Sequence, residues 1–148
     1  MKKIALITSG GDAPGMNACV RAIVKTCLGK GIVPVGYYDG YHGMMNDRFK
    51  EMTSDDVVNI IQRGGTVLGT ARSEEFKTAE GRQKAIDSLK KNNIDGFICI
   101  GGDGSFTGAS ILADEMSIPV IGIPGTIDND IYGTDRTIGF DTAMNTVV

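Results

Sequence analysis

The sequence predicts an α/β fold with a doubly wound, mostly parallel sheet flanked by helices. Three observations support this prediction. Apolar runs of about six residues recur along the chain, as expected for strands that are buried on both faces. Segments with apolar residues at three- and four-residue steps lie between these runs and indicate amphipathic helices. Glycine-rich turns follow the apolar runs, at the strand ends where parallel sheets bind ligands.

The first predicted elements are a strand over 3–8 and a helix over 16–27. Gly29 and Gly31 are expected to end this helix. A second strand follows over 32–38. A strand, a crossover helix and a second strand in this order predict parallel pairing with a right-handed connection.

Two local features qualify the next segments. Pro34 indicates that the second strand is an edge or irregular strand, because proline cannot donate a ladder hydrogen bond. Ser54, followed by Asp55 and Asp56, predicts a helix start with a cap and negative charge in its first turn. The apolar segment VVNII would continue that helix.

The second half repeats the alternation. Glycine-rich residues 62–76 are expected to form a loop, and Thr78 to cap a helix that ends near 92–93. The remaining predicted elements are a strand over 94–100, a helix from Gly104 or Ser105 to about Glu115, a strand over 118–123, a polar loop over 124–138 and a helix from about Asp141. The chain stops at NTVV within that helix, so we expect a portion of a longer protein.

Composition excludes several functional classes. The 148 residues suffice for one domain, and a net charge of −3 gives no global field for nucleic acid. Cys19, Cys27 and Cys99 lie in apolar contexts without the spacing of a zinc site or a disulfide framework. No apolar run approaches the roughly 20 residues of a membrane span. We therefore expect a cytoplasmic protein that does not bind membranes.

The first loop with chemical potential is TSGGDAPGMN, residues 8–17. Gly10 and Gly11 permit a close approach of the backbone, and Pro14 suits the first turn of a helix. The free N–H groups of that helix start form an anion site. The spacing is that of neither a dinucleotide fingerprint nor a P-loop, so a tight turn without a ligand is the alternative.

The second loop is ICIGGDGS, residues 98–105. Its three glycines allow backbone to lie against phosphates, whereas the Asp103 carboxylate would repel them. The combination is consistent with Mg²⁺, which prefers one or two carboxylates together with phosphate oxygens. Ser105 could cap the following helix. The alternative is that Asp103 only caps the helix or stabilises a turn.

The third loop, PGTIDNDIYGTD over 124–135, gathers Asp128, Asn129 and Asp130. Two neighbouring carboxylates can divide the roles of proton acceptor and metal or positioning group. A surface turn rich in Asx residues is the alternative, although Ile127 and Ile131 flank the acids.

Basic residues are few in these loops. Arg72 is the best candidate to neutralise charge during phosphoryl transfer, and a surface ion pair with Glu74 or Glu75 is its alternative. His42, the only histidine, is interpreted as an ordinary loop residue.

Taken in order, TSGGDAPGMN, RGGTVLGTAR, IGGDGS and PGTIDND resemble the N-terminal part of the bacterial ATP-dependent 6-phosphofructokinases over all 148 residues. The resemblance implies a Rossmann-like three-layer domain that forms the nucleotide-binding part of a two-domain kinase, with the sugar-phosphate domain beyond residue 148. It also implies transfer of the γ-phosphate of Mg-ATP to the 1-hydroxyl of fructose 6-phosphate in glycolysis.

The resemblance assigns roles to individual residues. Asp128 would be the general base, with Asp130 in the same catalytic cluster, and Thr126 would contact the sugar phosphate. Gly11 and Arg72 would stabilise the transferring phosphoryl group, and Asp103 would hold magnesium. The remaining nucleotide-binding positions would be Tyr41, Ser73, Gly102, Gly104, Ser105 and Gly108.

The resemblance also favours ATP over pyrophosphate as the phosphoryl donor. Relatives that use pyrophosphate carry an aspartate after the Gly-Gly-Asp turn and a lysine after the proline of the third loop. Gly104 and Gly125 stand at those positions here. An aspartate at position 104 would occupy the space of the α-phosphate and add like charge.

The family's effector site and assembly are implied less completely. Arg21 and Lys25 match half of the basic cluster that binds a nucleotide effector, but Ser54 stands where an arginine is expected, beside Asp55 and Asp56. The resemblance implies a homotetramer in which further sugar-phosphate ligands come from a second domain and from a neighbouring subunit. This portion alone is therefore expected to be inactive.

Two other functions share part of the pattern. Kinases of NAD or of lipids also carry the Gly-Gly-Asp-Gly turn, and a non-catalytic nucleotide-binding module would need only the glycine loops. PGTIDND together with GGDAPGMN favours the sugar kinase over both.

Overall fold

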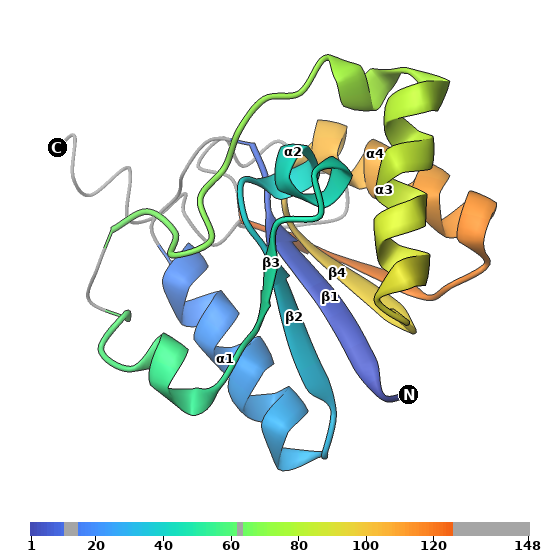
Figure 1. Ribbon diagram of the computed structural model, residues 1–148. Helices are drawn as coiled ribbons and strands as arrows, with labels where there is room; N and C mark the ends of the chain where they lie inside the picture. Colours follow the sequence, from blue (N-terminus) through green and yellow to red (C-terminus); the bar gives the residue numbers. More distant parts are fainter. Residues whose placement is uncertain (11–14, 62–63, 126–148) are drawn as a thin grey trace, which may run out of the picture.

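The computed structural model describes residues 1–10, 15–61 and 64–125. These residues form a five-stranded sheet in the order β3-β2-β1-β4-β5 (Figure 1). β1, β2, β4 and β5 pair in parallel, and β3 pairs antiparallel to β2. The strands are β1 Lys3–Thr8, β2 Val33–Tyr37, β3 Phe49–Glu51, β4 Gly96–Gly101 and β5 Val120–Pro124. The predicted doubly wound, mostly parallel sheet is confirmed.

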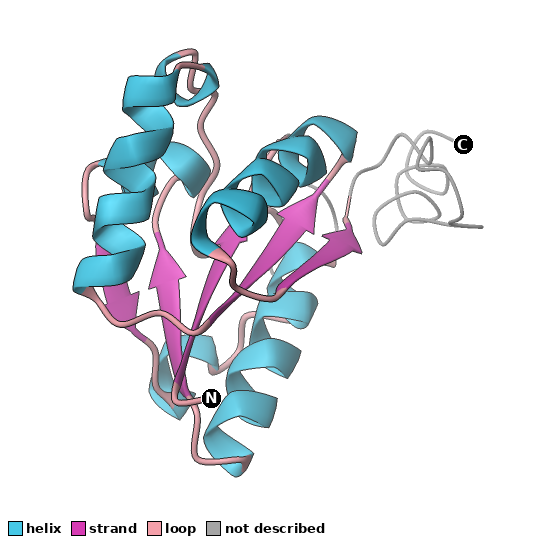
Figure 2. Ribbon diagram, turned by 90° about the vertical axis from the view of Figure 1, so that its right-hand side faces the viewer, coloured by secondary structure: helices cyan, strands magenta, loops and turns pink. Residues whose placement is uncertain are grey.

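Helices cover both faces of the sheet (Figure 2). The helix α1, Met16–Gly29, and the 3₁₀ turn η1, Ser54–Val57, lie on one face. The opposite face carries α2 Gly40–Met45, α3 Ala79–Lys91 and α4 Asp103–Met116. Alternation along β1 supplies both cores, since Ala5 and Ile7 pack with α2, α3 and α4 while Leu6 packs with α1.

The caps of α3 show how local sequence sets a helix boundary. Thr78 is the N-cap, and its Oγ1 accepts a hydrogen bond of 3.0 Å from the Gly81 N–H. Ala85, Ile86 and Leu89 of this helix are buried. The predicted cap and core face of this helix are confirmed.

The prediction that β2 is an edge strand is wrong. β2 lies between β1 and β3, and Pro34 is paired with Ile4 of β1. Pro34 is tolerated because the β3 ladder covers only 35–37, and beyond it the Pro34 carbonyl accepts a hydrogen bond from the Met52 N–H. The proline therefore stands at the end of a ladder, where a missing donor costs little.

The predicted helix that starts at Ser54 is also wrong. Only the single turn η1 forms, and its N-cap is Thr53, which makes a capping box with Asp56. Val58 is extended and Asn59 has a φ of 58°, so the backbone leaves the helical region at once. The short elements α2 and β3 were not predicted; α2 starts after Asp39, whose φ of 55° is equally unusual.

The topology places a ligand site at one end of the sheet. The chain leaves β1 toward β2 and leaves β4 toward β5, so the connections diverge between the central neighbours β1 and β4. A crevice opens at such a switch point, beyond the carboxyl ends of the two strands. The first two glycine loops of the sequence leave those two ends.

None of the helices in the described ranges is both long and apolar enough to cross a membrane. Cys19, Cys27 and Cys99 are free thiols, with Cys27 and Cys99 buried, which agrees with the predicted core cysteines.

Candidate nucleotide site

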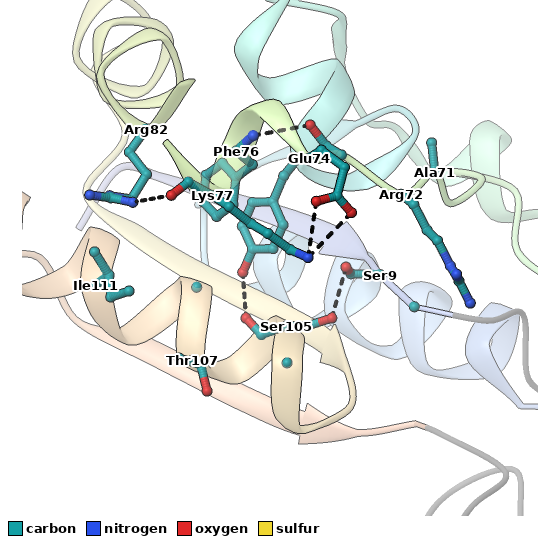
Figure 3. Close-up of a pocket in the computed structure, with 15 residues that line it drawn as sticks. Ser9, Ala71, Arg72, Glu74, Phe76, Lys77, Arg82, Ser105, Thr107 and Ile111 are labelled. Carbon is teal, nitrogen blue, oxygen red and sulfur yellow. Dashed lines mark hydrogen bonds and ion pairs between the residues drawn. The ribbon is translucent and has the colours of Figure 1, made fainter. Parts of the chain in front are cut away.

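A pocket of about 620 Å³ opens at the switch point between β1 and β4 (Figure 3). Its walls come from the turns after these strands, from α2, from α4, from residues 71–77 and from the first turn of α3. Of the predicted nucleotide-binding residues, it is lined by Tyr41, Arg72, Ser73, Gly104, Ser105 and Gly108. Residues from three separate sequence motifs thus meet around one cavity.

The turn after β1 forms one wall. Gly10 has a φ of 84°, a conformation that favours glycine. Ser9 ties this turn to β4, because its N–H donates to the Ile100 carbonyl at 2.9 Å and its Oγ accepts from Ser105 Oγ at 2.8 Å. Two loops far apart in sequence are thereby held together as one rim of the pocket.

The turn after β4 contains two glycines with different constraints. A Cβ at Gly101 would lie 2.8 Å from the Ser9 carbonyl oxygen, so packing of the two loops requires glycine there. A Cβ at Gly104 would meet no atom within 4 Å. Glycine within a helix costs up to about 0.5–1 kcal/mol relative to alanine, and Gly104 is the second residue of α4. The fold does not need Gly104, and the space it leaves open belongs to the pocket.

Two stacked aromatic rings form the inner wall. The rings of Tyr41 and Phe76 lie 3.9 Å apart at 10°, and the Tyr41 hydroxyl donates to the Ser105 carbonyl at 2.6 Å. Burial raises the pKa of Tyr41 far above its usual value, so the phenol remains a donor at neutral pH. Burial likewise raises the pKa of the neighbouring Cys99 thiol to about 12. A Cβ at Gly108 would lie 2.9 Å from Phe76, so glycine gives the ring its place.

Arg72 is the uncommitted cation of the pocket. It is exposed and makes no ion pair with a described residue. Its two suggested partners are engaged elsewhere, since Glu74 pairs with Lys77 and Glu75 pairs with Lys84. The structure thus provides no support for the alternative that Arg72 forms a surface ion pair.

Arg82 and Ile111 lie at the opposite end of the pocket from Arg72 (Figure 3). Arg82 donates to the Lys77 carbonyl at 3.0 Å, and its Nε lies 3.5 Å from Glu115. Together with Lys77, the lining thus carries three cations and the single carboxylate of Glu74. Since Lys77 pairs with Glu74 and Arg82 with Glu115, the positive charge left to attract an anionic ligand is that of Arg72.

Gly102 and Asp103 do not line the pocket. Gly102 is the N-cap of α4, and Asp103 is the exposed first residue of that helix, directly before Gly104. The Asp103 carboxylate makes no hydrogen bond to a described residue, so the alternative that it caps the helix through its side chain is not supported. Ser105 lies in the first turn and does not cap the helix either, which corrects that prediction.

Within the ranges that the structure describes, three or more His, Cys, Asp or Glu side chains nowhere gather as a cation site would require. A lone carboxylate at Asp103 is compatible with magnesium that arrives on a phosphate chain, because Mg²⁺ keeps water and phosphate ligands. Four predicted site residues lie outside the described residues: Gly11, Thr126, Asp128 and Asp130.

The pocket lining also includes residues that were not predicted, namely Phe76, Lys77, Arg82, Thr107 and Ile111. A signal for some of these residues was present. Gly104, Gly108 and Ile111 stand at helical spacing, so they share one face of α4. Lys77 and Arg82 carry no such signal, because their positions depend on how the start of α3 packs against α2 and α4.

The basic residues Arg21 and Lys25 lie away from this pocket, on α1. Arg21 donates to the Val57 carbonyl at 2.9 Å, and Lys25 Nζ lies 3.4 Å from Ser54 Oγ. Both cations are therefore bonded to η1.

The chain is similar to known proteins over nearly all of its length. The family model described as Phosphofructokinase matches residues 3–148. The chain is 60% identical over 148 residues to an ATP-dependent 6-phosphofructokinase of Clostridium tetani, covering 100% of the chain and 46% of the relative. It is 55% identical over 148 residues to ATP-dependent 6-phosphofructokinase 2 of Bacteroides thetaiotaomicron, covering 100% of the chain and 45% of the relative. The chain thus spans about half the length of the curated relatives it matches.

Solved structures agree in fold. A phosphofructokinase from Saccharomyces cerevisiae superposes with a TM-score of 0.95 at 39% identity, over 99% of this chain and 23% of that chain. A pyrophosphate-dependent phosphofructokinase from Marinobacter aquaeolei gives a TM-score of 0.82 at 24% identity, over 95% of this chain and 37% of that one. The latter likeness concerns the fold alone.

Proposed function

Because the chain belongs to the phosphofructokinase family, we propose that the intact protein transfers the γ-phosphoryl group of ATP to the 1-hydroxyl of fructose 6-phosphate. The observation that carries this proposal is the pocket at the switch point, where three family motifs supply glycine turns, a helix N-terminus and an uncommitted arginine. Phosphoryl transfer depends on positioning and electrostatics, and these groups provide both.

The described residues at this site have separate roles in the proposed reaction. Gly10, Gly104 and Ser105 hold the phosphate chain with backbone and the start of α4. Arg72 stabilises the charge that develops on the transferring group. Asp103 would hold Mg²⁺ through its unengaged carboxylate, and the metal supplies charge neutralisation when bound.

The open space at Gly104 supports ATP rather than pyrophosphate as the donor. A side chain there would point into space that the fold leaves empty, where an α-phosphate can lie. The pocket also extends from Arg72 to Arg82 and Ile111, which suits a ligand longer than pyrophosphate (Figure 3).

We assign the general base to Asp128, with Thr126 and Asp130 beside the reacting hydroxyl and Gly11 at the phosphoryl group. A positioned base contributes about 10²–10⁴-fold to the rate. Asp128→Asn in the intact protein should lower kcat by about that factor and leave the Kd for Mg-ATP within about twofold. A variant with wild-type kcat would remove Asp128 from this role.

One experiment tests the whole proposal. Turnover by the intact protein is measured with Mg-ATP and three acceptors: fructose 6-phosphate, NAD and diacylglycerol. We expect phosphorylation of the sugar phosphate alone. Phosphorylation of NAD or of the lipid would replace the proposed acceptor, and Mg-ATP binding without turnover would leave a nucleotide-binding module.

We further propose that the protein acts in the cytoplasm as a homotetramer, with a second domain that binds the sugar phosphate. Light scattering of the intact protein at micromolar concentration measures the oligomeric state, and a monomeric mass would contradict the assembly.

A further inference from the structure

We propose that two threonine hydroxyls, those of Thr8 and Thr66, position the loop that carries Arg72. This loop comprises residues 64–73. Thr8 is the last residue of β1 and is fully buried, and Thr66 lies near the start of the loop. Their Oγ1 atoms are 2.9 Å apart.

The direction of these hydrogen bonds follows from counting protons. Thr8 Oγ1 donates its one proton to the Gly69 carbonyl at 2.9 Å, so Thr66 must donate in the contact between the two hydroxyls. Thr66 Oγ1 accepts in turn from the Leu68 N–H at 3.2 Å. The result is one directed chain from Leu68 through Thr66 and Thr8 to Gly69, and such chains strengthen each member.

The location of these hydrogen bonds allows them to position Arg72. Gly69 stands three residues before Arg72, and Ser9, directly after Thr8, lines the same pocket as Arg72. Thr8 therefore joins the strand end that forms one wall of the pocket to the loop that delivers the cation. A valine would fill the same buried volume, so packing alone does not require a hydroxyl here.

Other contacts hold the loop at neighbouring points. The Val67 N–H donates to Asn17 Oδ1 at 2.7 Å, and the Asp39 N–H donates to the Leu68 carbonyl at 2.8 Å. Beyond Arg72, the Phe76 N–H donates to Ser73 Oγ at 3.2 Å. Arg72 itself has no ion pair to a described residue that would fix it, so the loop backbone sets where its side chain begins.

The first test needs no catalytic activity. Trypsin cleaves after exposed Arg72, and cleavage requires local opening of the loop. Because each substitution removes two hydrogen bonds, Thr8→Val and Thr66→Val should each accelerate cleavage at Arg72 roughly 30-fold. Cleavage at exposed Lys30, in the turn after α1, should stay at the wild-type rate, and Thr8→Ser should behave as wild type.

Controls separate this role from general stability. Thr53→Val removes a threonine whose side chain bonds to Asp56 and not to the loop, and it should leave the Arg72 rate unchanged. Equal acceleration at Arg72 and Lys30, or no acceleration at either site, overturns the proposal. Thr66 is only half-buried, so Thr66→Val decides the question if Thr8→Val fails to fold.

The second test rests on the proposed function. In the intact protein Thr8→Val should lower kcat about tenfold with the KM for Mg-ATP within about twofold, because the loop acts through a transition-state contact of Arg72. In an Arg72→Ala background it should lower kcat no further. Additive effects overturn the positioning role, whereas a wild-type protein without turnover refutes the function and leaves the proteolysis result standing.

Discussion

Two regions of the molecule present basic side chains beside a helix, and they differ in what those side chains already bind. In the pocket, Arg72 has no ion pair to a described residue, and glycine turns lie across from it. At the junction of α1 and η1, Arg21 is bonded to the Val57 carbonyl and Lys25 to Ser54. When a cation without a protein partner binds a ligand, the new contact offsets the cost of its desolvation. A cation that is already bonded must first give up its protein partner.

The surrounding charges reinforce the difference. η1 carries Asp55 and Asp56, and Asp56 holds both the Lys50 ammonium and the Thr53 N–H. Two carboxylates thus accompany Arg21 and Lys25 at this junction, whereas Arg72 in the pocket makes no ion pair with a described residue. The structure thus supports ligand binding in the pocket and a structural role for Arg21.

The largest expected effect concerns the uncommitted cation. Arg72→Ala in the intact protein should lower kcat by about 10³-fold, because an arginine on the transferring phosphoryl group contributes at least that much. Thermal stability should be unchanged, since no ion pair to a described residue is lost. Steady-state kinetics and calorimetry check both statements. Lys30→Ala, an exposed cation in the turn after α1, should match wild type.

The next effect concerns the empty space at Gly104. Gly104→Asp should weaken Mg-ATP binding by about 10²-fold in calorimetric titration, because it places like charge against phosphate. Gly104→Ala separates fold from function. It should raise the free energy of unfolding by about 0.5–1 kcal/mol as glycine leaves the first turn of α4, and still weaken binding. Unchanged binding in both variants would place the phosphates elsewhere.

A smaller effect is expected at the second region. Arg21→Ala removes the bond to Val57 and should lower the free energy of unfolding by about 1 kcal/mol, a Tm decrease of about 3 °C. The Kd for Mg-ATP in the pocket should not change. If this variant kept its Tm and lost nucleotide affinity, the contrast between the two regions would be reversed.

The smallest effect is a pH dependence at η1. Hydrogen bonds from Lys50 and from the Thr53 backbone hold the pKa of Asp56 below its usual value. A lowered folded pKa gives stability that is present above the unfolded pKa and is lost as pH falls through the folded value. The stability difference between wild type and Asp56→Asn should therefore be constant near neutrality and shrink below about pH 4 in urea titrations. A stability difference that stayed constant down to about pH 2 would contradict the lowered pKa of Asp56.

The periodic segments of the fold could be predicted from sequence because their signals are local. β1 and β4 are continuous apolar runs, and α3 has a threonine cap and a buried stripe. The wrong predictions concern segments whose conformation depends on neighbouring residues. Pro34 indicated an edge, but a three-residue strand from elsewhere covers β2. Ser54 resembled a helix start, but Thr53 closes a capping box and the backbone turns away at Asn59.

The candidate site likewise contains residues that could be predicted from sequence and residues that could not. Its glycines and Arg72 stood out in the sequence because unusual backbone and isolated charge are visible residue by residue. The stacking of Tyr41 on Phe76 joins residues 35 positions apart, and no local pattern encodes it. The positions of Lys77 and Arg82 in the lining likewise depend on how the start of α3 packs.

By itself, the sequence determined the four parallel strands, the helices α1, α3 and α4, the glycine turns at the strand ends and the family, because each depends on residue types along a short stretch. Only the tertiary structure decided which cation is free. Arg21, Lys25 and Arg72 are all positively charged at neutral pH, but a hydrogen bond depends on which carbonyl or hydroxyl oxygen the fold brings within about 3 Å. The tertiary structure also brings Thr8 into contact with Thr66, 58 positions away in the sequence.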